Sequence, residues 1–525
     1  MKKMKRFLFM ALMLLMSIAF YGCGSDKKDN AGKSDESVSS EEPTKGGSVV
    51  VGITQDLDSL DPHKAVAAGT REVMFNIFEG LFKPDENGDL QPALASDYSV
   101  NEEGTIYTFT IREGVKFHNG NTVTADDVVY SIKRVAGLLD KNEKDIRQIS
   151  ALKNISEVNK KDDSTVEVKL AVADTELTSY LTAGDCAVIP ADYTDEATKP
   201  VGTGPFVFES YSPLDSMVVK KNADYWNTEA MPYLDEVTFK IFSSADAAFL
   251  QVQAGSVDIL AYLTDEQANQ LSNSDCDVKE GNMNLVQGLF LNNKTEPFNN
   301  PKVREALNYA IDKQAIIDMV ADGKGTIIGS NLTPGLSSYY DESLSGLYQT
   351  NVEKAKELLK EAGYENGLKF KISVPSNYQF HVDTAQVIVE QLKQAGITAE
   401  INLIDWSTWL SDVYTKRDYQ ATIVGLDGNL SPRNFMERFK SDADNNFINF
   451  NNKEYDSILK EVLSATDDET KVTDYKKLQA VLAEDSASVY LQDPALLVAV
   501  NKKLGGYKFY PVYVQDMSSI YYTAQ

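Results

Sequence analysis

Strand-like runs alternate with capped, helix-like segments along the chain from about residue 46 onward. Residues 48–53 are rich in valine, and residues 107–111 and 165–170 alternate polar with apolar side chains at the period of a β-strand. Asn300 precedes a proline at a first helical position, and Asn351 opens an amphipathic run. Further helices are expected at residues 125–139, 453–465 and 472–482. This alternation predicts an α/β body without internal repeats, of roughly two to four domains.

The N-terminus has the organisation of a secretory signal peptide. Four basic residues within the first six are followed by an uncharged apolar run over residues 7–20, which is short for a bilayer span. Gly22 then precedes Cys23, and this junction resembles a bacterial lipobox. We expect cleavage before Cys23 and acylation of that cysteine, which would attach the protein to the outer face of the cytoplasmic membrane. An uncleaved signal anchor is the alternative.

The remaining composition limits the partners. Residues 1–22 are the expected signal peptide, and residues 23–45 the expected lipid anchor and flexible tether, because this second segment has almost no apolar side chains. The formal net charge of −27 argues against nucleic acid or anionic lipid surfaces as partners. No later segment reaches the roughly 18 apolar residues of a spanning helix. The two cysteines after Cys23 form either one disulfide or two buried thiols: Cys186 and Cys276.

Motifs for catalysis and metal binding are missing. The sequence has three histidines, none at metal-ligand spacing: His63, His118 and His381. Three aspartates lack the glycine and glutamate of a calcium loop and are interpreted as a polar turn: Asp56, Asp58 and Asp61. The glycine-rich residues 202–205 precede a strand, not a helix, and are interpreted as a crossover turn. We therefore expect no metal, no cofactor and no enzymatic activity.

Several segments, in order along the chain, resemble the solute-binding proteins of family 5, the extracytoplasmic receptors of peptide and nickel ABC importers. The longest is YTFTIREGVKFHNGNTVTADDVVYSIKR, residues 107–134, which is similar to the signature block of that family. Others are NIFEGLF (residues 76–82, similar to an early helix of the family), QPALASDY (91–98), PVGTGPF (200–206), QAGSVDI (253–259) and PKVREALNYAID (301–312). The resemblance covers nearly everything after Lys45.

The resemblance implies a two-lobed, type II periplasmic-binding-protein-like α/β fold with an extra subdomain, which closes on its ligand by hinge bending. Lobe I is expected to combine residues 46–78, 198–290 and 492–525. The inserted subdomain is expected at residues 79–197, and lobe II at residues 291–491. The expected hinge strands lie near residues 291–292 and 490–491.

The resemblance also implies a ligand site. Peptide receptors of this family hold an extended peptide by main-chain hydrogen bonds, and in many of them an aspartate binds the α-ammonium group. Asp427 occupies a similar segment, residues 425–435, which also contains Asn429. Trp406 matches an indole that often lines the cleft, and Tyr378 belongs to a second segment where dipeptide-specific relatives carry an arginine. That arginine is absent here, so oligopeptides are expected over dipeptides.

The expected function is that of a monomeric receptor that captures peptides and delivers them to the permease and ATPase complex of an ABC importer. A receptor for another solute, such as a nickel chelate, an oligosaccharide or an opine-like compound, is the alternative within the fold. A secreted hydrolase is a remote third reading, because it would need a nucleophile or metal constellation.

Overall fold

The structure is a computed structural model and describes residues 43–139, 145–147, 149, 151–512 and 514–524. The expected signal peptide, Cys23 and nearly all of the tether lie outside these residues. In the described part, no helix is long and apolar enough to cross a bilayer. Nor do three His, Cys, Asp or Glu side chains gather there as they would around a metal ion. Cys186 and Cys276 are both buried and free, which is the second of the two expected alternatives.

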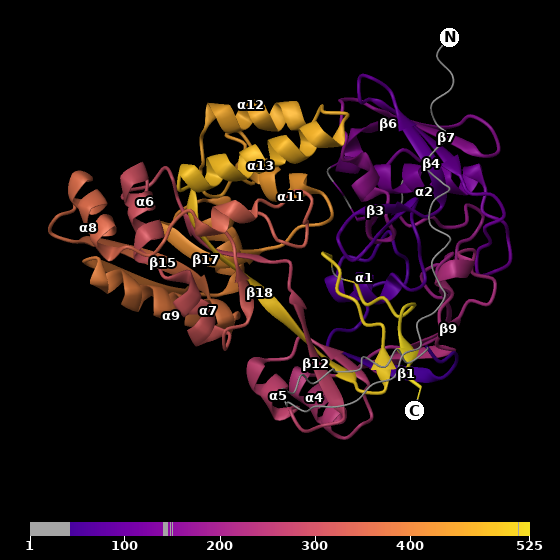
Figure 1. The fold of residues 1–525 in the computed structure, drawn as a ribbon. Helices are drawn as coiled ribbons and strands as arrows, with labels where there is room; N and C mark the ends of the chain where they lie inside the picture. Colours follow the sequence, from indigo (N-terminus) through magenta and orange to yellow (C-terminus); the bar gives the residue numbers. More distant parts are fainter. Residues whose placement is uncertain (1–42, 140–144, 148, 150, 513, 525) are drawn as a thin grey trace, which may run out of the picture. The chain divides into compact units, whose positions relative to one another are not determined.

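Twelve of the described strands form one continuous sheet, and its long strand β18 is labelled in Figure 1. Its order is β16-β15-β17-β13-β18-β11-β1-β10-β9-β8, and β12 and β14 also pair with β18. The strand bounds are β1 Ser48–Ile53, β8 Phe206–Ser212, β9 Ser216–Lys221, β10 Glu236–Ile241, β11 Ile259–Ala261, β12 Cys276–Asn282, β13 Val286–Leu291, β14 Gly325–Ile327, β15 Leu368–Pro375, β16 Ile397–Ile404, β17 Ala421–Leu426 and β18 Ser488–Asn501. The expected strand at residues 48–53 is confirmed.

One long strand, β18, joins the two halves of this sheet. Its C-terminal part pairs with β11 and β12, whereas its N-terminal part pairs with β13 and β14. The expected boundary assigned β13 to lobe I, but β13 pairs with β17 and therefore lies in the sheet of lobe II. We accordingly place the two crossings at residues 283–285 and 492–494. At that point the backbone N–H of Met283 donates to the carbonyl of Pro494 at 2.9 Å.

The inserted subdomain has its own four-stranded antiparallel sheet, of order β4-β5-β7-β6, with helix α2 against it. Its elements are β2 Phe82–Pro84, β3 Leu90–Pro92, β4 Ala95–Val100, β5 Ile106–Ile111, β6 Ile155–Lys160, β7 Thr165–Leu170, α2 Ala125–Ala136, α3 Ala183–Cys186, η1 Ala151–Asn154 and η2 Leu177–Tyr180. Thr124 and Asp127 form the capping box that begins α2. The helix ends at Ala136, earlier than expected, because Gly137 takes a left-handed conformation with φ 71°.

Lobe I carries short helices around β1, β10 and β11. They are α1 Ala68–Met74, α4 Ala245–Gln253, α5 Asp265–Gln270 and η3 Thr228–Ala230, and β19 Leu504–Gly505 pairs with β20 Tyr521–Tyr522. The segment NIFEGLF was expected to be helical, and this expectation is wrong, because α1 ends just before it. Asn76 is fully buried there, and its side-chain amide donates to the carbonyls of Val73 and Gln515. This polar anchor turns the chain toward β2.

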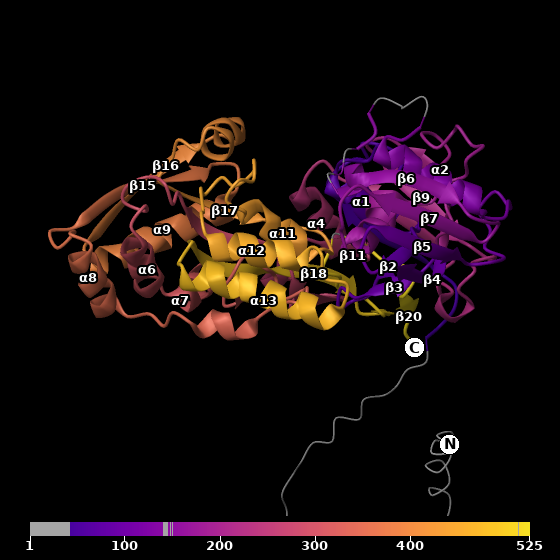
Figure 2. The same ribbon diagram turned by 90° about the horizontal axis from the view of Figure 1, so that it is seen from above.

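In lobe II, α9 packs against β15, β16 and β17, and η5 packs against β15. Its helical elements are α6 Pro301–Ala310, α7 Lys313–Val320, α8 Val352–Glu361, α9 Gln379–Gln394, α10 Trp406–Thr408, α11 Pro432–Met436, α12 Lys453–Val462 and α13 Asp468–Glu484, with η4 Glu342–Gly346, the π-helical η5 Trp409–Thr415 and η6 Glu437–Phe439. Helices α12 and α13 lie side by side (Figure 2). The caps Asn300 and Asn351 begin α6 and α8 as expected, each accepting a backbone N–H in the first turn.

Candidate ligand-binding site

Two of the expected site residues meet on lobe II in an aromatic group. The ring of Trp406 stacks on that of Trp409 with centroids 4.8 Å apart, and the ring of Tyr378 meets Trp406 edge-on at 5.5 Å. Trp409 is buried, and its indole N–H donates to the hydroxyl of Thr422 at 2.9 Å. Trp406 and Tyr378 remain 36% and 43% exposed. A fixed indole thus supports two large aromatic side chains that are open to solvent.

The expected anchor Asp427 follows β17 and has an exposed side chain. Its backbone carbonyl accepts a hydrogen bond from the Arg438 guanidinium at 3.4 Å. Burial lowers the pKa of Arg438, and the charge of Asp427 is among the influences that oppose this shift. A positive group of the protein therefore already lies near Asp427.

Asn429 shapes the loop that holds Asp427. Its side-chain oxygen accepts the backbone N–H of Ser431 at 2.9 Å and also bonds the side-chain amide of Asn434. This is an Asx turn, and it leads into Pro432 at the start of α11. The structure therefore gives Asn429 a positioning contact within the loop.

His381 links the segments of Tyr378 and Asp427, and the sequence offered no sign of this role. Its Nε2 accepts the backbone N–H of Gly425 at 3.1 Å, and its Nδ1 lies 2.9 Å from the side-chain amide of Gln287 on β13. Burial lowers the pKa of His381 to about 4, so the ring is neutral at pH 7. A neutral imidazole therefore holds the backbone of Gly425, two residues before Asp427.

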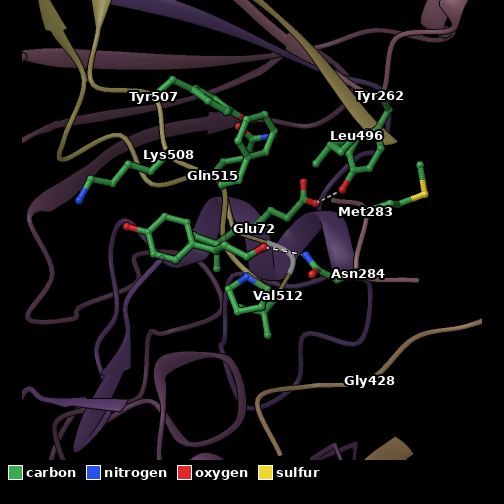
Figure 3. A pocket seen from close by; sticks show the side chains of 14 residues that line it. Glu72, Tyr262, Met283, Asn284, Gly428, Leu496, Tyr507, Lys508, Val512 and Gln515 are labelled. Atoms are coloured by element: carbon green, nitrogen blue, oxygen red, sulfur yellow. Dashed lines mark hydrogen bonds between the residues drawn. The ribbon is translucent and has the colours of Figure 1, made fainter. Parts of the chain in front are cut away.

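A small cavity lies beside the loop of Asp427, and most of its lining residues belong to lobe I (Figure 3). Its lining includes the polar side chains of Glu72, Tyr262, Asn284 and Gln515, and Gly428 of lobe II also borders it. Glu72 belongs to α1, and one of its carboxylate oxygens accepts a hydrogen bond from the Tyr262 hydroxyl. The cavity volume is about 20 Å³.

The Glu72 carboxyl is buried, and its pKa is far above that of an ordinary glutamate. Burial raises its pKa to about 7, while the Tyr262 hydroxyl and the charge of Arg71 act in the opposite direction. Asp58, in the expected polar turn, holds α1 in place, because its carboxylate accepts the backbone N–H groups of Val66 and Ala67 at 2.8 and 2.9 Å. The polar turn is thus confirmed, and its function is to fix the helix that carries Glu72.

The inserted subdomain touches lobe II at the start of α11. Arg433 forms an ion pair with Asp174, and the Ser431 hydroxyl donates to the carboxylate of Glu176 at 3.1 Å. Burial raises the pKa of Glu176, a shift that the charge of Lys471 opposes. These contacts bridge two parts of the chain that are more than 250 residues apart.

The other residues that the sequence singled out are structural. Asp61 forms a buried ion pair with Arg134 at 2.6 Å. The glycine-rich residues 202–205 form a crossover turn into β8, as expected. At Gly202 an added Cβ would lie 2.1 Å from the carbonyl oxygen of Ile77, so only glycine allows this approach. His118 bonds the carbonyl of Gly204 at 3.0 Å within the same turn.

Comparisons with known proteins agree with this architecture. A model of bacterial extracellular solute-binding proteins, family 5 (middle), matches residues 89–447, more than half of the chain. The oligopeptide-binding protein AppA of Bacillus subtilis (strain 168) is 28% identical over 552 residues, which cover 97% of each chain.

Two solved structures resemble the chain over most of its length. One is the B. subtilis oligopeptide-binding protein AppA in complex with a nonapeptide, with a TM-score of 0.69, 25% identity, and coverage of 92% of this chain and 100% of the other. The second is the binding protein AgaA of A. tumefaciens R10 in complex with agropinic acid. Its TM-score is 0.70 at 28% identity, covering 91% of this chain and 99% of the other.

Proposed function

This chain belongs to the bacterial extracellular solute-binding proteins of family 5, and from that premise we propose that it is the peptide receptor of an ABC importer. The receptor captures oligopeptides between its two lobes and delivers them unchanged to the permease and its ATPase. The likeness to an oligopeptide-binding protein over 97% of both chains supports the choice of peptides.

The observation that carries the proposal is the exposed aromatic pair of Trp406 and Tyr378 on a fixed support. Large apolar rings that remain in solvent on a rigid element are typical of binding surfaces, where aromatic residues contribute much of the affinity. His381 ties the backbone of the Asp427 loop to the helix that follows Tyr378. Lobe II therefore carries an exposed aromatic pair and an exposed carboxylate in segments that His381 joins.

In this proposal Asp427 binds the α-ammonium group of the peptide. The contact is charge-assisted, and it strengthens when the closing lobes exclude water. Arg438 competes electrostatically for the same carboxylate, because its guanidinium lies beside the Asp427 backbone. Ser376 and Asn377 supply no bidentate partner for a peptide carboxylate, so we propose that peptide length is weakly restricted.

We also propose that the receptor is tethered by lipid. The apolar leader before Cys23 and the polar residues after it support acylation at Cys23, with the segment to residue 45 as a spacer. The tether would hold the binding domain close to its permease.

A second candidate ligand is a non-peptide solute of the opine type. The likeness to a protein solved with agropinic acid, at 28% identity, favours keeping this candidate. With either ligand the protein acts as a receptor, and the two candidates differ only in the kind of molecule that binds between the lobes.

A ligand screen by thermal unfolding tests the proposal. A ligand that binds only the folded state stabilises it by RT ln(1 + [L]/Kd), about 2.7 kcal/mol at a hundredfold excess over Kd. We expect stabilisation by peptide mixtures and none by sugars or nickel. Small-angle scattering should then show a smaller radius of gyration with the peptide, which should be recovered intact. Stabilisation by opines alone would select the second candidate, and cleaved peptide would overturn the receptor role.

A further inference from the structure

We propose that the cavity around Glu72 is a subsite for the ammonium group of a lysine side chain in the bound peptide. This inference rests on the proposed peptide-receptor function. The lysine ammonium would bind in a part of lobe I that borders the loop of Asp427. Its main partner there would be Glu72, which no sequence motif marked.

Two residues of the cavity lining have buried side-chain oxygens that lack donors in the described part of the chain, and that of Asn284 lies against Gly335, outside the lining. The side-chain oxygens of Gln515 and Asn284 are buried and have no hydrogen-bond partner among the residues that the structure describes. Gln515 is only 5% exposed. The orientation of the Asn284 amide is fixed, because its nitrogen donates to the carbonyl of Tyr510 at 2.9 Å (Figure 3). Buried acceptors without donors are costly, so a ligand that donates hydrogen bonds is favoured here.

The third acceptor, Glu72, adds negative charge. It is 6% exposed, and the Tyr262 hydroxyl occupies one of its oxygens. A cation at this point would relieve the cost of burying the carboxylate and hold it ionised. Arg71 adjoins Glu72 in the chain and interacts with it electrostatically. The nearby cation Lys508 is directed elsewhere: its ammonium binds Glu86 at 3.2 Å, and its side chain extends away from Glu72 (Figure 3).

The size and walls of the cavity select the kind of cation. A volume of about 20 Å³ holds one group the size of water, which needs roughly 10 to 15 Å³. An ammonium head has that size, whereas a planar guanidinium is larger. The rest of the lining is mainly apolar and includes Met283, Leu496, Tyr507, Val512 and Val514. Because this volume takes only the head group, the four-carbon stem of a lysine would lie outside it and pack on neighbouring apolar surface.

The place of the cavity connects it to the peptide. Gly428, the residue after Asp427, borders the cavity from lobe II, so the cavity opens beside the loop proposed to hold the α-ammonium. A peptide anchored at Asp427 would bring its side chains past this opening. An α-ammonium is attached directly to the peptide backbone, for which a volume of about 20 Å³ leaves no room.

Calorimetry with alanine pentapeptides tests the inference. Each peptide carries one lysine, at a different position, and is compared with its Nε-acetyl-lysine counterpart. We expect the lysine form to bind about tenfold tighter or more at one position, since a hydrogen bond to a charged group is involved. In Glu72→Gln this preference should fall to about twofold or less. The matched control is Glu196→Gln, a buried acid whose pKa burial raises to about 8 and which lies outside the cavity lining; it should keep the preference.

A second variant keeps the inference testable if Glu72→Gln does not fold. Tyr262→Phe removes the hydroxyl that holds Glu72 and should reduce the lysine preference in part, and thermal unfolding checks that each variant is folded. Equal affinity for the lysine and acetyl-lysine peptides at every position in the wild type would overturn the subsite but leave the receptor function standing. If Glu72→Gln instead loses the preference of the wild type for a free over an N-acetylated amino end, the cavity holds the α-ammonium and the side-chain assignment is rejected. Absence of binding by all the peptides would reject both proposals.

Discussion

Arg433 of lobe II and Asp174 of the inserted subdomain form an ion pair that is largely shielded from solvent. The Asp174 side chain is 3% exposed and that of Arg433 is 17% exposed. Both ends of the pair are further bonded. Arg433 donates to Glu437 at 2.7 and 3.0 Å, and Asp174 accepts the backbone N–H of Glu176 at 3.0 Å. The contact therefore joins two side chains that are each held by further hydrogen bonds.

Replacing Arg433 by glutamine should loosen this junction. The buried Asp174 carboxylate would lose its partner, and we expect a loss of roughly 2 to 3 kcal/mol, below the 3 to 5 typical of fully buried pairs, because Arg433 is partly exposed. Scattering should show a larger radius of gyration for the ligand-free variant. Glu437→Gln is the control, since it breaks only a surface pair worth about 1 kcal/mol or less. Identical unfolding of the two variants would contradict this role for the pair.

Asp427 should discriminate peptides by their amino end. We expect a free peptide to bind about a hundredfold tighter than its N-acetylated form, because acetylation leaves the enclosed carboxylate without a charged partner. In Asp427→Asn the two forms should bind similarly. Titration calorimetry of both peptides against both proteins measures this. If the wild type already binds the two forms equally, Asp427 is not the anchor and a non-peptide solute becomes the better candidate.

Trp406 should contribute affinity without contributing much stability. We expect Trp406→Ala to weaken peptide binding about 30-fold, the size of a typical aromatic hot spot. The melting temperature should change little, because Trp409 keeps its hydrogen bond to Thr422. Leu410, which is 40% exposed on the following helical turn, provides the control Leu410→Ala. If the two substitutions weaken peptide binding equally, the aromatic stack does not contribute specifically to affinity.

Asp493 should make stability depend on pH. Burial raises its pKa to about 7, whereas an unfolded aspartate titrates near about 3.9. Between these values the folded protein binds more protons than the unfolded chain, so this group lowers stability as pH rises, by at most about 1.4 kcal/mol per pH unit. Asp493→Asn should lose this contribution and gain stability relative to the wild type from pH 4 to pH 7. Parallel melting curves across that range would contradict it.

Cys23 should determine where the protein is found. We expect Cys23→Ala to appear in the medium or to remain as an unprocessed precursor, because its acylation site is gone. Fractionation, followed by mass measurement of the N-terminus, distinguishes the two. Normal processing with retention at the membrane would rule out the lipid anchor.

Local chemistry made much of the fold predictable. The strands at residues 48–53 and 165–170 and the helix starts at Asn300 and Asn351 are encoded by neighbouring residues, through side-chain alternation and capping. The place of β13 was not predictable in this way. Its run of apolar residues suits either half of the sheet, and only its pairing with β17, about 130 residues later, decides between them.

Part of the candidate site could be proposed from the sequence, and its binding role stays a prediction. Trp406, Tyr378 and Asp427 lie in segments that resemble known binding segments. Glu72 and His381 do not, and each has an ordinary position in an amphipathic helix. Their importance comes from Tyr262, Gly425 and other partners that are distant in sequence, and burial of a polar side chain by tertiary contacts leaves no local pattern.

The two crossings between the lobes lie next to each other, because Met283 bonds directly to Pro494. Lobe II is therefore a single insertion into what could otherwise be a β-hairpin formed by β12 and β18. A short turn in place of residues 284–493 would reconnect lobe I without stretching the chain. The excised segment would begin and end on neighbouring strands. Its two ends could therefore be joined, and new termini could be made in another loop. The receptor can thus be treated as two exchangeable modules, with lobe II open to replacement or circular permutation.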